Sequence, residues 1–150
     1  MRKFEIVKDE FIKYGEKDVV IPHRSTKFSA GYDMYSPSDV IIPAGGIGTV
    51  WTNIKVACNS DEFVMICVRS SIGRKGLCLA NDVGIIDSDY YGNPETDGNI
   101  GIMLRNTTTN DFAIKKGDKI AQAIFMKYLT VDGEEEILAS RCGAFGSTGK

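Results

Sequence analysis

The polar residues whose types and spacing best suit chemistry lie in the stretch 81–92, NDVGIIDSDYYG. Asn81 and Asp87 are six residues apart, so a straight strand would separate them by roughly 20 Å at ~3.3 Å per residue. We therefore predict that the chain doubles back at Gly84 and presents backbone N–H and C=O groups to a planar heterocycle. Asp87 follows the apolar Ile85 and Ile86, which indicates a partly desolvated carboxylate able to act as a base. The alternative is that the acids at 82, 87 and 89 are only turn residues.

A second stretch, RSSIGRKG at 69–76, has the groups that hold phosphate oxygens. Arg69 supplies a guanidinium, Ser70 and Ser71 supply hydroxyls, and the backbone N–H groups of a helix start add further donors. Ser70 or Ser71 could also cap a single helical turn. A capped, solvated basic turn would have the same sequence, so the phosphate site is one of two interpretations.

Two shorter motifs each hold one further polar candidate. Asp33, in AGYDM, could place a hydrated divalent cation, because Mg²⁺ prefers carboxylate oxygen and keeps several waters. The simpler interpretation is a strand entry with a bend at Gly31. Gln122 alternates with Ile120 and Ile124, so its amide needs polar partners, either the backbone or a ligand.

The C-terminal stretch RCGAFGSTGK sets one aromatic residue among glycines and hydroxyls. Its spacing does not fit the phosphate loop G-x-x-x-x-G-K-[ST], so a P-loop ATPase is rejected. Glycine amides with the hydroxyls of Ser147 and Thr148 could wrap an anion, and Phe145 offers a flat face of the kind that stacks on bases. A phosphate and a base together describe a nucleotide.

These motifs lie between short β-branched and aromatic runs that predict about ten strands, among them DVVIP at 18–22 and GTVWTNIKVA at 48–57. Punctuation by Gly, Pro, Asn and Asp and the lack of long helical periodicity favour an all-β sandwich or barrel with one short helix within 69–76. The run 63–68, FVMICV, is apolar throughout and is predicted to be buried on both faces. We expect one β domain over residues 1–139 and a flexible arm over 140–150.

Composition limits the partners. The chain has 150 residues, 43% hydrophobic, with a formal net charge of -2, which argues against stable binding to nucleic acid or to an anionic membrane. No apolar run is long enough for a signal peptide or a membrane span, so a soluble, intracellular, cytoplasmic protein is expected. The four cysteines form no C-x-x-C pair, which favours reduced thiols over a zinc site.

In order and spacing, AGYD, RSSIGRKGL, NDVGIIDSDYYG, KGDKIAQAIF and GAFGSTGK resemble the five motifs of the trimeric dUTP diphosphatases (dUTPases). The resemblance implies a distorted jelly-roll β fold and a homotrimer with active sites shared between subunits. The implied reaction converts dUTP and water to dUMP and pyrophosphate with Mg²⁺, which keeps uracil out of DNA and supplies dUMP for thymidylate synthesis.

The resemblance also implies a role for each matched residue. Asp87 would activate the water that attacks the α-phosphorus, and Tyr90 would lie under the deoxyribose. Asn81 and the backbone of Gly84, Ile85 and Ile86 would read uracil. Phosphates would be held by Arg69, Ser70, Ser71, Gln122 and Arg141. Asp33 would support the metal's water shell or the hydrogen bonds of the site. Phe145 would cover uracil, and Gly146, Ser147 and Thr148 would close on the terminal phosphate.

Several positions depart from the family pattern. Tyr91 stands where Arg is commonest, residues 93–99 lengthen the following loop, and Arg141 is four rather than five residues before Phe145. The main alternative, dCTP deaminase, would need a catalytic Glu in the third motif and a different tail. A non-catalytic nucleotide-binding protein and a structural jelly roll are further alternatives, and both leave ordered polar motifs unused.

Overall fold

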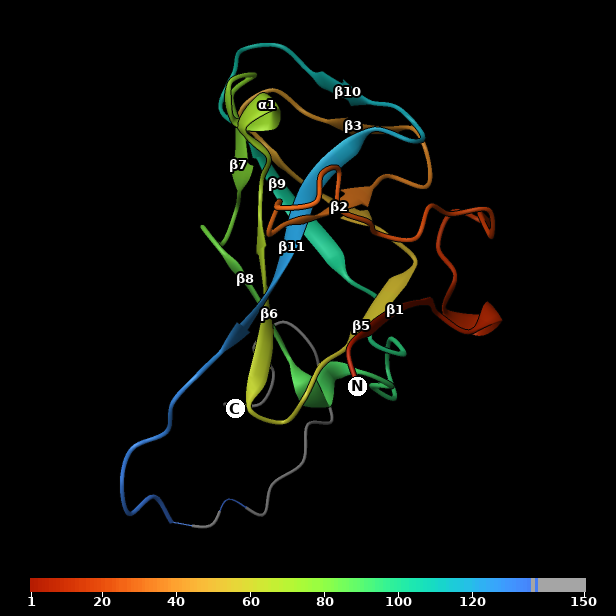
Figure 1. The fold of residues 1–150 in the computed structure, drawn as a ribbon. Helices are drawn as coiled ribbons and strands as arrows, with labels where there is room; N and C mark the ends of the chain where they lie inside the picture. Colours follow the sequence, from red (N-terminus) through yellow and green to blue (C-terminus); the bar gives the residue numbers. More distant parts are fainter. Residues whose placement is uncertain (136, 138–150) are drawn as a thin grey trace.

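The computed structural model describes residues 1–135 and 137, and the predicted arm 140–150 lies outside them. Within the described part the chain forms eleven strands and three short helical turns (Figure 1). The strands are β1 (Lys3–Ile6), β2 (Tyr32–Tyr35), β3 (Val40–Ile42), β4 (Ile47–Trp51), β5 (Ile54–Ala57), β6 (Glu62–Cys67), β7 (Leu77–Leu79), β8 (Gly84–Asp87), β9 (Gly101–Asn106), β10 (Phe112–Ile114) and β11 (Lys119–Lys127). The turns are the α-helix α1 (Ser70–Gly73) and the 3₁₀ helices η1 (Asp9–Phe11) and η2 (Ser88–Tyr90).

The strands form four small antiparallel sheets. The largest has the order β2-β11-β6-β8, and a second has the order β4-β9-β7. The pairs β10-β3 and β1-β5 complete the fold. Most neighbours in these sheets are far apart in sequence, as in jelly-roll folds. The predicted all-β class with one short α-helix is confirmed.

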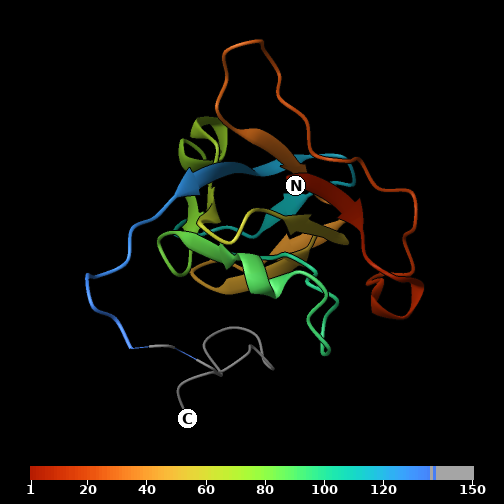
Figure 2. The same ribbon diagram turned by 60° about the horizontal axis from the view of Figure 1, so that its bottom comes forward.

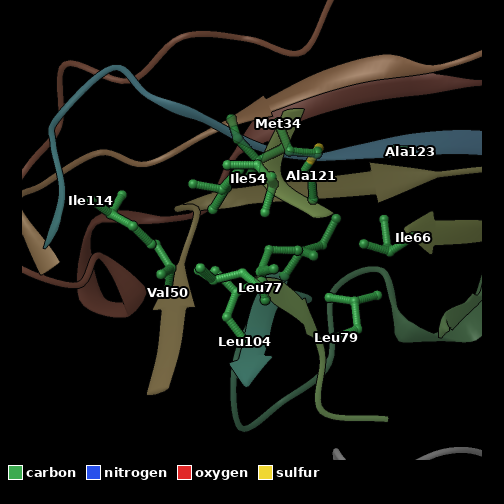
Figure 3. Close-up of a cluster of buried hydrophobic side chains, with 14 of the residues drawn as sticks. Met34, Val50, Ile54, Ile66, Leu77, Leu79, Leu104, Ile114, Ala121 and Ala123 are labelled. Atoms are coloured by element: carbon green, nitrogen blue, oxygen red, sulfur yellow. The ribbon is translucent and has the colours of Figure 1, made fainter. Parts of the chain in front are cut away.

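The core lies between the sheets and consists mainly of β-branched and leucine side chains. Figure 3 shows side chains from several strands meeting there, among them Met34, Val50, Leu77 and Leu104. Each fully buried aliphatic side chain of this kind stabilises the fold by about 1.5–3 kcal/mol. This packing fixes the strands that carry the polar motifs.

Three local predictions are wrong. The run 48–57 is not one strand, because a turn at Asn53 (φ 58°) separates β4 from β5. Residues 18–22 form no strand, and Val20 and Ile21 are partly exposed. Neither Ser70 nor Ser71 caps α1, since Arg69 holds the N-cap position and makes no capping hydrogen bond with its side chain.

The long segment between β1 and β2 runs around the outside of the sheets (Figure 2).

β6 is buried on one face only, contrary to the sequence prediction. Val64 and Ile66 point into the core, whereas Phe63, Met65 and Cys67 are half-exposed. Antiparallel sheets commonly pack one face on the core and leave the other open. The open face of β6 is therefore apolar, and it extends onto the neighbouring strands.

None of the helices among the described residues has the length and apolar character needed to cross a bilayer.

Candidate active site

A cavity of about 370 Å³ opens between β6, β8 and β9. It brings together six of the residues predicted from the third motif: Asn81, Gly84, Ile85, Ile86, Asp87 and Tyr90. Apolar side chains from the neighbouring strands supply most of the remaining wall, among them Ile66, Leu79, Ile102 and Met103. The cavity thus combines apolar walls with a few polar groups, as ligand pockets commonly do.

The bend that brings Asn81 and Asp87 to one cavity lies at Asp82, not at Gly84 as predicted. Asp82 has φ 61°, and the Val83 N–H donates to the Asn81 carbonyl at 2.6 Å. β7 pairs with β9 while β8 pairs with β6, so the turn passes between two sheets and is not a hairpin. Asp is one of the few non-glycine residues that tolerate this left-handed conformation.

Gly84 is needed for a different reason, which is close packing. A Cβ at this position would lie 2.9 Å from the Cβ of Ile66 in β6, the residue paired with it. Only a residue without a side chain lets the two strands approach this closely. Gly84 therefore allows β8 to lie close to β6 where the two strands line the cavity.

Asp87 is the last residue of β8 and lies opposite Phe63 of β6. Its side chain is half-buried at the edge of the cavity. η2 begins directly after it and places Tyr90 in the same cavity. The Tyr90 side chain is buried, and its hydroxyl donates to the Asn99 carbonyl at 3.0 Å. The predicted base and the predicted sugar-facing ring thus line one cavity.

The predicted phosphate-binding residues gather at a second hollow, beside α1. It is lined by Arg69, Ser70, Ser71 and Gln122, together with Arg74, which the sequence reasoning did not single out. Two guanidinium groups, two hydroxyls and an amide in one hollow are well suited to phosphate oxygens. A signal for Arg74 was present, since it stands in the same basic stretch as Arg69.

The Asp33 carboxylate lies between two cationic side chains. Arg69 Nε is 3.0 Å from Oδ1, and Lys119 Nζ is 2.7 Å from Oδ2. The Ser25 hydroxyl also donates to Oδ2, at 2.6 Å. Burial alone would raise the pKa of Asp33, but the hydrogen bonds from Lys119 and Ser25 and the charge of Arg69 outweigh it and lower the pKa. Both oxygens of this carboxylate are thus engaged in holding neighbouring side chains.

Gly31 allows the Gln122 amide to lie beside β2. A Cβ on Gly31 would come within 2.2 Å of Gln122 Oε1. Gln122 lies opposite Asp33 on one side and Cys67 on the other. The predicted bend at Gly31 is therefore less important than the space that this glycine leaves for the amide.

Asp87 and the hollow beside α1 lie near opposite ends of β6, although the cavity itself extends along β8 as far as Gly84, opposite Ile66. Asp87 is opposite Phe63, and Gln122 is opposite Cys67, four residues further along and so about 13 Å away. In Figure 1, α1 lies at the upper end of β6, whereas the chain leaves β8 toward the lower end. The side chains of Met65, Ile124 and Ile85 form an apolar row across the sheet between them.

Over residues 1–135 and 137, no group of three or more His, Cys, Asp or Glu side chains could hold a metal ion. Cys58, Cys67 and Cys78 are free thiols. The predicted contacts of Arg141, Phe145, Gly146, Ser147 and Thr148 fall outside the described residues.

An all-β fold with a largely apolar cavity and a separate cluster of two arginines, two serines and a glutamine defines a candidate nucleotide-binding protein. Comparison with known proteins makes the class specific. The dUTPase family model matches residues 17–149. A deoxyuridine 5'-triphosphate nucleotidohydrolase of Lactococcus lactis is 40% identical over 151 residues, covering 99% of this chain and 98% of the relative. The chain belongs to the dUTPase family.

Solved structures agree with this assignment. The crystal structure of dUTPase from Streptococcus mutans has a TM-score of 0.78 and 35% identity, covering 87% of this chain and 99% of that one. A mutant dUTPase of phage phi11 of S. aureus, whose structure reveals the coordination of a structural Mg(II) ion, has a TM-score of 0.71. At 19% identity, with 93% of this chain and 97% of that one covered, the phage protein supports the fold alone.

Proposed function

We propose that this protein hydrolyses dUTP to dUMP and pyrophosphate. The observation that carries the proposal is the cavity that holds Asn81, the backbone of 84–86, Asp87 and Tyr90 together. The chain matches nearly the whole length of a relative that is named for this activity, which supports the same reaction here. The cell would use it to keep uracil out of DNA and to supply dUMP, in the cytoplasm.

The base is read by polar groups in an apolar setting. The Asn81 amide and the N–H and C=O groups of 84–86 would bond the polar edge of uracil, while Ile66 and Ile102 enclose its faces. A buried donor or acceptor rejects a base that cannot pair with it, because the unpaired group costs free energy. The same tight walls would exclude the methyl group of thymine. Tyr90 would lie under the deoxyribose and leave no room for a 2′-hydroxyl.

Asp87 would act as the general base. Its carboxylate takes a proton from a water molecule, and the water oxygen attacks the α-phosphorus. The bond from that phosphorus to the α,β-bridging oxygen breaks, and pyrophosphate leaves. Phosphoryl chemistry depends mainly on positioning and charge neutralisation, so one base and several donors suffice.

Arg69, Ser70, Ser71 and Gln122 would hold the phosphates. Of the two roles considered for Asp33, its contacts favour the support of hydrogen bonds, because both oxygens are engaged by Arg69, Lys119 and Ser25. Asp33 would then orient the guanidinium of Arg69 toward phosphate. Lys119 and Ser25 are additional positioning residues that only the structure suggests.

Mg²⁺ would enter with the substrate, held mainly by the phosphates. Mg²⁺ needs only one or two carboxylates when phosphates and water fill its other positions, which agrees with the lack of a three-ligand group among the described residues. When bound, the ion would neutralise charge that builds on the phosphates. Asp87 could contact its water shell, whereas Asp33 is already committed to two cations.

A homotrimer with shared sites is the assembly that membership of the dUTPase family supports. The apolar face left open on the sheet offers a surface for contact between copies of the chain. The apolar row of Ile124, Met65 and Ile85 lies on the open face, and the Ile85 side chain is 51% exposed. Burying this face against another copy would remove these apolar side chains from water. The arm 140–150 would close over the assembled site.

A substrate panel tests the proposed reaction. The protein, with Mg²⁺, is incubated separately with dUTP, dTTP, UTP and dCTP, and the products are separated by chromatography. We expect dUMP and pyrophosphate from dUTP, with dTTP at least about tenfold slower because of its methyl group. Release of ammonia from dCTP, without pyrophosphate, would instead identify a deaminase.

A further inference from the structure

The loop 93–99, between η2 and β9, packs against Tyr90 and is tied to parts of the chain that do not line the cavity. We propose that this loop positions the Tyr90 ring through its hydroxyl and so sets the preference for deoxyribose over ribose. The inference rests on the proposed function, since it concerns the sugar that Tyr90 would contact. Thr96 is the side chain through which the loop would act.

The Tyr90 hydroxyl is held on both sides by the loop. It donates to the Asn99 carbonyl at 3.0 Å and accepts from Thr96 Oγ1 at 3.0 Å. A phenol held by a donor and an acceptor cannot swing without breaking both bonds. The ring plane at the cavity is therefore coupled to the position of the loop.

The loop has its own internal framework. Asn93 Oδ1 accepts from the N–H groups of Glu95 at 2.9 Å and Thr96 at 3.2 Å. The Gly98 N–H donates to Thr96 Oγ1 at 3.2 Å, and Thr96 Oγ1 also lies 3.3 Å from Asn93 Oδ1. Gly98 has φ 82°, and a Cβ there would lie 2.7 Å from the Tyr90 carbonyl oxygen. The loop thus lies directly against the tyrosine backbone as well as its hydroxyl.

Buried polar contacts anchor the loop to the N-terminal segment and to β5. Asp97 is 2% exposed, and its Oδ2 accepts from the Lys8 N–H at 2.8 Å and from Lys55 Nζ at 2.7 Å. Asn99 is equally buried, and its Oδ1 accepts from the Asn53 N–H at 3.0 Å. Buried polar groups in a satisfied network hold one arrangement strongly. The network gives the Tyr90 hydroxyl a fixed point outside the cavity.

Deoxyribose and ribose differ by one oxygen atom, the 2′-hydroxyl. Rejection of a ribose 2′-hydroxyl by a ring depends on the ring staying in place, because a small displacement would make room for the extra atom. Loss of the hydroxyl bonds should therefore lower the ratio of kcat/KM for dUTP to that for UTP. A loop that only stabilises the fold would lower stability without changing this ratio.

The test compares kcat/KM for dUTP and for UTP in four variants of the full-length protein. Thr96→Val removes the donor and keeps the shape, and Tyr90→Phe removes the phenol oxygen and keeps the ring. The double variant measures their coupling, and Thr96→Ser restores the hydroxyl. Thr108→Val is the matched control, since Thr108 Oγ1 also bonds an Asn side chain in a turn, Asn106 Oδ1 at 2.8 Å, but contacts nothing at the cavity.

We expect Thr96→Val and Tyr90→Phe each to lower the ratio of kcat/KM for dUTP to that for UTP about three- to tenfold, the range of one hydrogen bond. The double variant should have a ratio close to that of Tyr90→Phe alone, because the Thr96–Tyr90 bond is already lost in Tyr90→Phe. Thr96→Ser and Thr108→Val should keep the wild-type ratio.

Unchanged selectivity in both single variants, with dUTP still hydrolysed, would overturn the positioning role, as would additive effects in the double variant. Failure of the wild-type protein to hydrolyse dUTP would overturn the proposed function, and the inference with it. If Thr96→Val does not fold, Tyr90→Phe and Thr96→Ser still decide the question.

Discussion

At the scale of single residues, Asp87 carries the chemistry in this account. Asp87→Asn keeps the size of the side chain but removes the group that accepts the proton. We expect turnover of dUTP to fall by at least about 10²-fold, the contribution of a general base. Binding of a non-hydrolysable dUTP analogue, measured by calorimetry, should stay within a few-fold of wild type. Undiminished turnover would place the base elsewhere.

Gly31 provides a second residue-scale prediction, about the phosphate-binding hollow. In Gly31→Ala the new methyl group would overlap the Gln122 amide oxygen, which can move away, and would lie 3.1 Å from Gln122 Cβ, a tight contact that a small shift relieves. We therefore expect little change in thermal stability but a higher KM for dUTP, similar to that of Gln122→Ala. A KM equal to wild type would show that the Gln122 amide does not need its observed position for phosphate binding.

At the scale of elements, the pairing of β6 with β8 shapes the cavity wall. Gly84→Ala would place a methyl group against the Ile66 side chain, within a well-packed sheet. Overpacking of this kind costs about 1–3 kcal/mol, so the free energy of unfolding should fall by that amount in a denaturant titration. Activity should also fall, since Ile85 and Ile86 would shift with the strand. A stability equal to wild type would mean that the two strands separate without cost.

The sequence predicted most of the strands and the local grouping around Asp87, because alternation and turn residues are local signals. It also grouped Arg69 with Ser70 and Ser71 correctly, since they are adjacent in the chain. It placed the bend at Gly84 because glycine is the usual residue for a turn, whereas the constraint on Gly84 comes from Ile66, a distant residue. The contacts of Lys119 with Asp33 depend on strand register, which shifts between Lys119 and Ala121.

At the scale of the whole molecule, the proposed homotrimer has active sites that are shared between chains. Asp87→Asn and Arg69→Met each disable a different part of the site, so each variant alone should be inactive. When the two are unfolded together and refolded as a mixture, some sites should combine an intact Asp87 from one chain with an intact Arg69 from another. We expect partial recovery of activity in the mixture, and none in either variant treated alone. No recovery in mixed oligomers would indicate that each chain builds its own site.

The central claim is that a water activated in the Asp87 cavity attacks the α-phosphorus of dUTP. The most direct measurement is hydrolysis of dUTP in water enriched in the heavy oxygen isotope, followed by mass spectrometry of both products. We expect one heavy oxygen in dUMP and none in pyrophosphate, and formation of both products at least about 10²-fold more slowly by Asp87→Asn. Heavy oxygen in pyrophosphate, or in no product, would contradict it.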